Sequence, residues 1–166
     1  MRKNYMDTMY RIRSMVTAVF LLLPAVALSQ QTIPPDKEGL LKGQGMGLAE
    51  IAETNNYPGP RHTLDLKNEL GLTRDQSKKT EALDKVVASA ALAKGEEIVL
   101  AEEELSKLFE AGTISEKVLR SKLEEIGKLR ADLRFIHLQA HLRMKQILTP
   151  DQIKRYAVLR GHEAKR

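Results

Sequence analysis

The sequence of 166 residues contains no cysteine and no tryptophan, and aromatic residues make up only 4% of it. Without cysteine the chain can form no disulfide bond, no thiolate zinc site and no thiol nucleophile. Few aromatic residues and few glycines, together with many Glu, Lys, Leu and Ala, argue against a β-sandwich and favour long helices. The length allows at most one domain, and we expect no large enzyme core.

The N-terminal segment has the features of an export signal. A start with four basic residues and one acidic residue precedes an apolar run from Met15 to Leu28, and Ala27 and Ser29 suit cleavage before Gln30. The run is shorter than the about 20 residues that a membrane helix needs. We therefore predict a cleaved signal peptide over residues 1–29; the alternative is an uncleaved N-terminal anchor.

The remainder of the chain divides into a leader, a helical domain and a tail. Residues 30–57 contain Pro34, Pro35 and several glycines, which predicts an extended, flexible leader with one weak helical patch near Leu48–Ile51. Residues 58–162 form the predicted all-helical domain, which begins with a short helix from about Pro60 to Leu70, and residues 163–166 form a charged tail. Outside residues 1–29 the charge is nearly balanced, so we expect no nucleic acid as a partner.

Hydrophobic periodicity predicts two long helices, one from Thr73 to about Glu110 and one from Ser115 to Ile147. The turn at residues 111–115 is so short that the two helices must fold back against each other. The predicted fold is thus all-α: a long antiparallel helical hairpin flanked by two short helices. Because a two-helix hairpin has a poor core of its own, we expect pairing into a homodimer.

A five-residue pattern occurs at both ends of this hairpin. The sequence Leu72-Thr73-Arg74-Asp75-Gln76 recurs as Leu148-Thr149-Pro150-Asp151-Gln152. In each, threonine followed three residues later by glutamine predicts a capping box, in which two backbone donors at the start of a helix are bonded by side chains. We expect Leu72, Thr73, Gln76, Leu148, Thr149 and Gln152 to define where two helices begin.

The paired pattern resembles the LTxxQ motif of the Spy/CpxP family of periplasmic chaperones and stress-response proteins, including its heavy-metal sensor and resistor branch. The segments 45–49 (GMGLA) and 57–62 (YPGPRH) also look like the leader of that branch. The resemblance covers about residues 45–161. It implies a periplasmic protein in which two hairpins pair into a cradle-shaped dimer.

A second apolar stripe lies opposite the main one on each long helix. Ala88, Leu92 and Val99 form it on the first helix, and Phe135, Leu138 and Leu142 on the second. The short helices, a second subunit or an unfolded client can each cover it, so these residues are predicted client-binding or dimer residues. Client binding would be passive and ATP-independent, through weak contacts with exposed hydrophobic segments of stressed envelope proteins.

His137 and His141 are four residues apart, and Met144 follows on the same edge of the helix. This spacing can hold one divalent metal ion such as zinc, copper or nickel, with oxygen from Asp84 or Glu81 on the facing helix. Two interfacial histidines that donate to carboxylates explain the spacing equally well.

Catalysis finds no support, because no serine lies beside a histidine–carboxylate pair and no HExxH motif occurs. We therefore expect no enzyme and no required cofactor. The leading hypothesis is an exported ATP-independent chaperone that binds unfolded clients. A periplasmic metal sensor or resistance protein is the alternative, and an adaptor whose second stripe only dimerises is a third reading. A membrane sensor protein is a further expected partner.

Overall fold

The computed structural model describes residues 33–162. The predicted signal peptide, its cleavage site and the charged tail lie outside these residues. The described part is helical and contains no strand, with six helices in chain order: α1 (Lys37–Leu41), α2 (Glu50–Glu53), α3 (Pro60–Asp65), α4 (Arg74–Glu110), α5 (Glu116–Ile147) and α6 (Pro150–Leu159). None of these helices is long and apolar enough to span a membrane.

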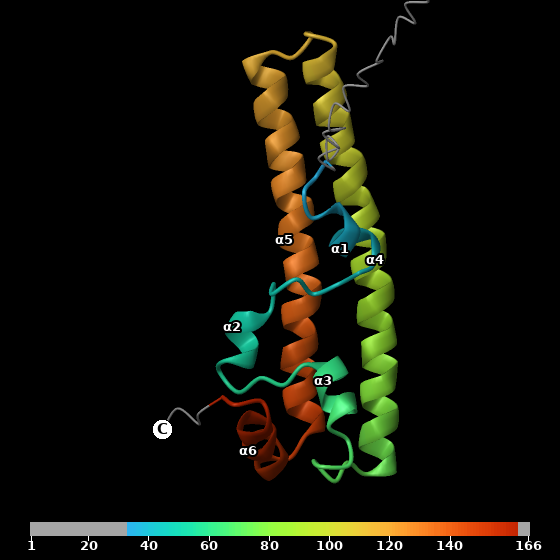
Figure 1. Cartoon of the computed structure of the whole chain (residues 1–166), viewed down its shortest axis with the longest axis vertical. Coiled ribbons are helices and arrows are strands. Elements are labelled where there is room, and N and C mark those ends of the chain that lie inside the picture. The colour runs from blue at the N-terminus through green and yellow to red at the C-terminus, as the bar shows by residue number, and fades with distance from the viewer. Residues whose placement is uncertain (1–32, 163–166) are drawn as a thin grey trace, which may run out of the picture. The chain divides into compact units, whose positions relative to one another are not determined.

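The long hairpin is present as predicted. Helices α4 and α5 run side by side and are joined by the turn at residues 111–115 (Figure 1). The hydroxyl of Thr73 caps α4 by accepting the backbone N–H of Gln76, and the hydroxyl of Ser115 caps α5 by accepting that of Val118. The prediction of an all-α hairpin with short flanking helices is therefore confirmed.

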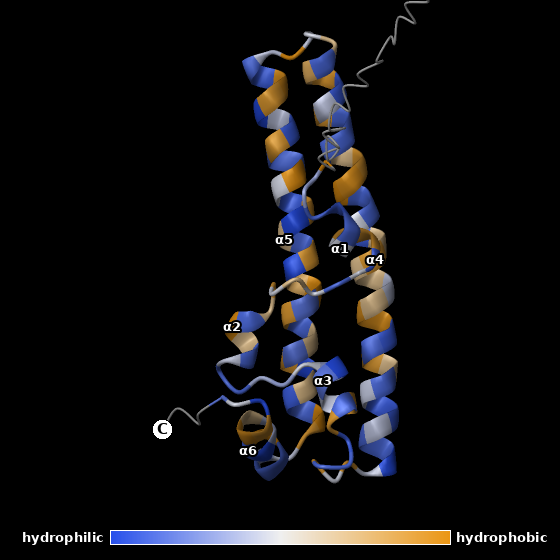
Figure 2. Ribbon diagram, viewed as in Figure 1, coloured by the Kyte–Doolittle hydropathy of each residue, from blue (hydrophilic) through white to orange (hydrophobic). Residues whose placement is uncertain are grey.

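Two apolar clusters hold the hairpin together. Apolar residues recur along both long helices (Figure 2), and those that face the other helix are buried. One cluster contains Leu40, Ala91, Ile98, Val99 and Leu133, and the other contains Leu83, Ala140, Met144 and Leu148. The first cluster includes a residue from far outside the hairpin, Leu40, so the core is not built by α4 and α5 alone.

The extended path predicted for the leader is wrong for residues 33–57, although α2 overlaps the weak helical patch predicted near Leu48–Ile51. This segment forms α1 and α2 and lies along the hairpin (Figure 1). Leu40 of α1 is only 1% exposed because it packs into the cluster between α4 and α5. The glycines that suggested flexibility serve specific turns, since Gly43 and Gly47 have positive φ angles of 60° and 74°.

Helix α3 is shorter than the predicted helix from Pro60 to Leu70. It ends at Asp65, and residues 66–71 form hydrogen-bonded turns, in which Leu72 N–H donates to Lys67 O at 3.0 Å. Gly71, with φ of 61°, turns the chain toward the start of α4. The early end of α3 follows from the need to reverse direction before Thr73.

Candidate functional site

The two halves of the predicted second apolar stripe have different surroundings. On α5, Phe135 and Leu142 are 60% and 54% exposed, and Leu138 between them is half-buried. Their spacing of three and four residues places all three on one face of α5, opposite Leu133 and its neighbours in the core. We call Phe135, Leu138 and Leu142 the α5 stripe; it remains an open apolar surface among the described residues.

The half on α4 is covered by the chain only in part, because Val99 is buried whereas Ala88 and Leu92 are exposed. Val99 is buried in the cluster with Leu40, and Gly43 packs on the backbone of α4 between Ala88 and Leu92. A Cβ atom added at Gly43 would lie 3.1 Å from Ala88 O and 3.2 Å from Leu92 N. Of the three coverings considered for this face, the intrachain one is therefore present on α4, although it comes from residues 37–43 and not from the flanking helices.

The two LTxxQ motifs meet in space. Each forms a full capping box, on α4 at Thr73 and Gln76 and on α6 at Thr149 and Gln152. The amides of the two glutamines also bond each other, with Gln76 Nε2 donating to Gln152 Oε1 at 2.8 Å and Gln152 Nε2 donating to Gln76 Oε1 at 3.1 Å. The sequence predicted the caps but not this mutual contact.

Further bonds join this glutamine pair to two other segments. Gln76 Nε2 reaches Ile147 O at 3.0 Å, and Gln152 Nε2 reaches Leu70 O at 3.3 Å. Leu148, buried beside Ile153, completes the same region with an apolar contact. The six motif residues therefore close the open end of the hairpin, and their role in the described chain is architectural.

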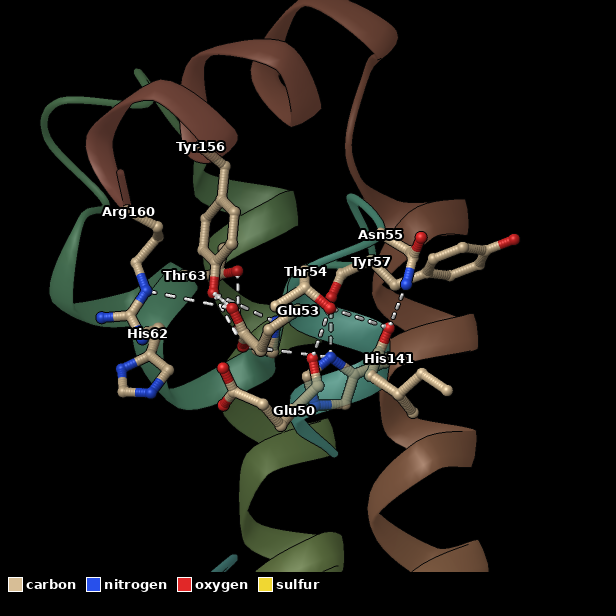
Figure 3. Close-up of polar contacts among 12 residues, drawn as sticks. Glu50, Glu53, Thr54, Asn55, Tyr57, His62, Thr63, His141, Tyr156 and Arg160 are labelled. Atoms are coloured by element: carbon tan, nitrogen blue, oxygen red, sulfur yellow. Dashed lines mark hydrogen bonds and ion pairs between the residues drawn. The ribbon is translucent and has the colours of Figure 1, made fainter. Parts of the chain in front are cut away.

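A buried carboxylate ties α2 to α5 and α6. Glu53 is buried, and the hydroxyl of Tyr156 donates to its two oxygens at 2.9 and 2.8 Å (Figure 3). Arg160 Nε lies 3.9 Å and His141 Nδ1 4.0 Å from the carboxylate. Burial of Tyr156 and its bond to Glu53 raise the pKa of the tyrosine hydroxyl. A buried acid with these partners fixes the end of the leader.

His137 and His141 line one cavity of about 500 Å³ between residues 42–62, α4 and α5. His141 is buried, and its Nδ1 lies 2.7 Å from Tyr57 O. Nε2 of His137 is buried and has no hydrogen-bond partner. Burial and the nearby His141 lower the pKa of His137, so its imidazole stays neutral to lower pH than usual.

The structure does not bring the three predicted metal ligands together. Met144 is fully buried in the hairpin core with Leu83 and does not line the cavity. Asp84 does line the cavity, but Arg61 binds its carboxylate at 2.8 Å. Among residues 33–162, no group of three or more His, Asp or Glu side chains is arranged to hold a metal ion. Met144 is in the core because, at its position, the side of α5 that carries the predicted ligands is also the side that packs against α4.

Sequence reasoning missed Glu53, Tyr156 and Gly95. A Cβ atom at Gly95 would lie 2.8 Å from the carbonyl carbon of Leu40 and closer still to its oxygen. A glycine in the middle of a long helix costs about 1 kcal/mol relative to alanine. A glycine at this position could therefore have indicated that another segment of backbone packs closely against the helix. Glu53 and Tyr156 gave no such signal, because their contact joins residues 103 positions apart.

Comparison of the chain with protein-family models, curated proteins and solved structures finds no match.

Proposed function

We propose that this chain is an exported, ATP-independent chaperone that holds unfolded segments of envelope proteins on the α5 stripe. The observation that carries the proposal is the exposure of Phe135 and Leu142 on one helical face, with the half-buried Leu138 between them. Export to the periplasm and the Spy/CpxP resemblance belong to the proposal too, and they rest on sequence. No catalytic step is part of it.

The surroundings of the α5 stripe suit weak and tolerant binding. Arg134 and Arg143, which adjoin Phe135 and Leu142 in sequence, are exposed. Apolar side chains next to mobile cationic ones favour client segments that combine apolar residues with acidic neighbours. A second copy of the hairpin can share this surface, so homodimerisation is part of the same proposal, and a membrane sensor is a further proposed partner.

The test replaces one leucine on the stripe and one equally exposed leucine elsewhere. Leu142→Glu places a charge on the α5 stripe, and Leu100→Glu places the same charge on α4, where Leu100 is 61% exposed. A half-exposed leucine that becomes buried against a client contributes about 1 kcal/mol, or about fivefold in the dissociation constant. We expect Leu142→Glu to suppress client aggregation about fivefold less well, and Leu100→Glu to match the unmodified chain.

The measurement is light scattering of a thermally unfolding client, with helix content checked by circular dichroism. Equal protection by a folded Leu142→Glu variant would refute the assignment of clients to this stripe. Analytical ultracentrifugation of the same variants shows whether the stripe pairs two copies, and a loss of dimer without loss of protection would assign it to dimerisation alone.

A divalent metal site is the second proposal, and one observation favours it. The unpartnered Nε2 of His137 and the ring of His141 lie at one cavity. Imidazole nitrogen is a donor that zinc, copper and nickel accept. Calorimetric titration with each metal, beside a His137→Ala/His141→Ala variant, tests it. Binding that the double variant retains would refute this site.

A further inference from the structure

We propose that the N-terminal half of residues 33–57, a segment here called the cover, is displaceable and that the α4 face beneath it is a second client-binding surface. This inference rests on the proposed chaperone function and adds how its binding area is regulated. The segment that the face accepts has the chemistry of the cover itself: a short helix with one leucine anchor and an acidic residue before it.

The α4 face is shaped to receive a short helix. Leu40 enters the apolar cluster formed by Ala91, Ile98, Val99 and Leu133. Gly95 leaves room for the backbone of α1 to rest directly on α4. A helical segment can therefore bind here with one apolar side chain in the cluster and its backbone against the surface at Gly95.

An acidic residue is recognised beside this pocket. Arg130 on α5 donates to both oxygens of Asp36, at 2.8 and 3.3 Å, and also to Glu102 at 2.8 Å. The bond from Arg130 lowers the pKa of Asp36, as expected for a carboxylate held by a guanidinium group. Asp36 precedes Leu40 by one helical turn, so the two contacts together define the segment that the face selects.

The N-terminal half of the cover is weakly attached. Helix α1 has only five residues and no side-chain cap, so it has no stability apart from its contacts. The ion pair Lys37–Glu103 joins side chains that are partly exposed, and such a pair contributes little and weakens with salt. Asp36 is held more firmly, by the bidentate contact with Arg130. Leu40 and Pro34 are the buried side chains of this half, so few apolar contacts hold it, which makes residues 36–43 a candidate for local opening.

The C-terminal end of the cover is held differently. Glu53 is buried and bonded by Tyr156, so α2 stays anchored to α5 and α6 when α1 detaches. A tethered segment returns readily, because the tether keeps its local concentration high. The cover thus competes with clients for the α4 face, and only a client segment that binds better displaces it.

The test opens the cover without altering the face that it covers. Leu40→Asp removes the anchor, and Leu41→Asp places the same charge on the neighbouring side chain, which is 42% exposed. Hydrogen exchange of the amides of residues 37–43 reports opening. An accessible fraction of one tenth in the unmodified chain raises the apparent dissociation constant about tenfold. We therefore expect Leu40→Asp to protect clients at a chaperone-to-client ratio about threefold to tenfold lower than the unmodified chain needs. Leu41→Asp should need the same ratio as the unmodified chain.

Two further measurements complete the test. A synthetic peptide of residues 33–57, added to the Leu40→Asp variant, should return protection to the unmodified level. The double variant Asp36→Asn/Lys37→Gln removes two ion pairs and leaves Leu40 in place; it should open the cover less and improve protection less. These results would support competition for one face.

Several outcomes would overturn the inference. One is rapid exchange in Leu40→Asp with protection equal to that of Leu41→Asp; the α5 stripe would then be the whole binding area, and the proposed function would stand. Another is cooperative loss of the α4 and α5 helices in Leu40→Asp, with no increase in exchange of residues 37–43 in the double variant, because the cover would then be inseparable from the fold. The proposed function is tested separately, by comparing client aggregation in the presence of Leu142→Glu and Leu100→Glu.

Discussion

The chain contains two glycines inside its long helices, and we predict that replacing them by alanine has opposite effects. Gly127 on α5 is exposed, and an added Cβ atom would meet nothing within 4 Å. Gly95 on α4 is buried under the carbonyl group of Leu40. Both substitutions offer the same gain in helix propensity, about 1 kcal/mol. Gly127→Ala should therefore raise the free energy of unfolding by about that amount.

At Gly95 the same gain meets a larger loss. The new methyl group collides with backbone atoms of α1, which cannot rotate away as a side chain can. Overpacking of this kind costs about 1–3 kcal/mol. Detachment of α1 instead exposes Leu40, at a cost of about 1.5–3 kcal/mol. Along either route we expect Gly95→Ala to be about 1–3 kcal/mol less stable than Gly127→Ala.

Two measurements on both variants check this. Urea unfolding followed by circular dichroism gives the free energy of unfolding, and hydrogen exchange at residues 37–43 shows whether α1 has detached. In Gly95→Ala we expect those amides to exchange faster, while in Gly127→Ala they keep their protection. If the two variants gained equal stability and equal protection, the close approach of α1 to α4 would be refuted.

Three further predictions concern polar groups. Gln152→Ala removes the side-chain amide that bonds Gln76 and accepts the Thr149 N–H in the cap of α6, so we expect the free energy of unfolding to fall by about 1–3 kcal/mol in urea titrations. A loss below about 0.5 kcal/mol would contradict the role of the glutamine pair. Tyr156→Phe leaves Glu53 buried without its donor, and we expect a loss of about 1.5–3 kcal/mol by the same assay, with no change counting against that bond. The lowered pKa of His137 means that the unfolded chain takes up its proton first as the pH falls. Stability should therefore decrease below about pH 6.5, and a smaller decrease in the urea midpoint between pH 7.5 and 5.5 in His137→Leu checks it; an identical decrease would refute that origin.

The long helices could be predicted from sequence because their signals are local. Apolar residues at helical spacing and the caps at Thr73, Ser115 and Thr149 define α4, α5 and α6 without reference to the rest of the chain. The turn at residues 111–115 is short enough to fix the antiparallel arrangement. The hairpin is thus encoded by segments that each specify their own structure.

The cover could not be predicted in the same way. Its residues include several glycines and few apolar side chains, which locally indicate a flexible segment. Its helices form because Leu40 finds a site on α4 and Glu53 finds Tyr156, and both partners are distant in sequence. For the same reason the sequence placed Val99 on a second apolar stripe but could not show that Leu40 covers it.

The histidines were only partly interpretable. The spacing of His137 and His141 correctly placed both on one side of α5, facing a single cavity. Periodicity alone could not separate that side from the hairpin seam, so Met144 was grouped with them although it packs against Leu83. The hydrogen-bond partners of the imidazole nitrogens of His137 and His141 depend on the path of residues 45–59, which no local sequence pattern specified.

The contact between Gln76 and Gln152 has a consequence for how the length of this protein can change. The chain leaves that contact along α4, turns at residues 111–115 and returns along α5 to the first turn of α6, where Gln152 Oε1 lies 2.8 Å from Gln76 Nε2. One extra helical turn in a single arm would displace the returning end by about 5.4 Å and break the amide pair. Matched additions to both arms, or changes within the turn, preserve it. The length of the hairpin can therefore change only by matched insertions or deletions in α4 and α5, or by changes within the turn that joins them.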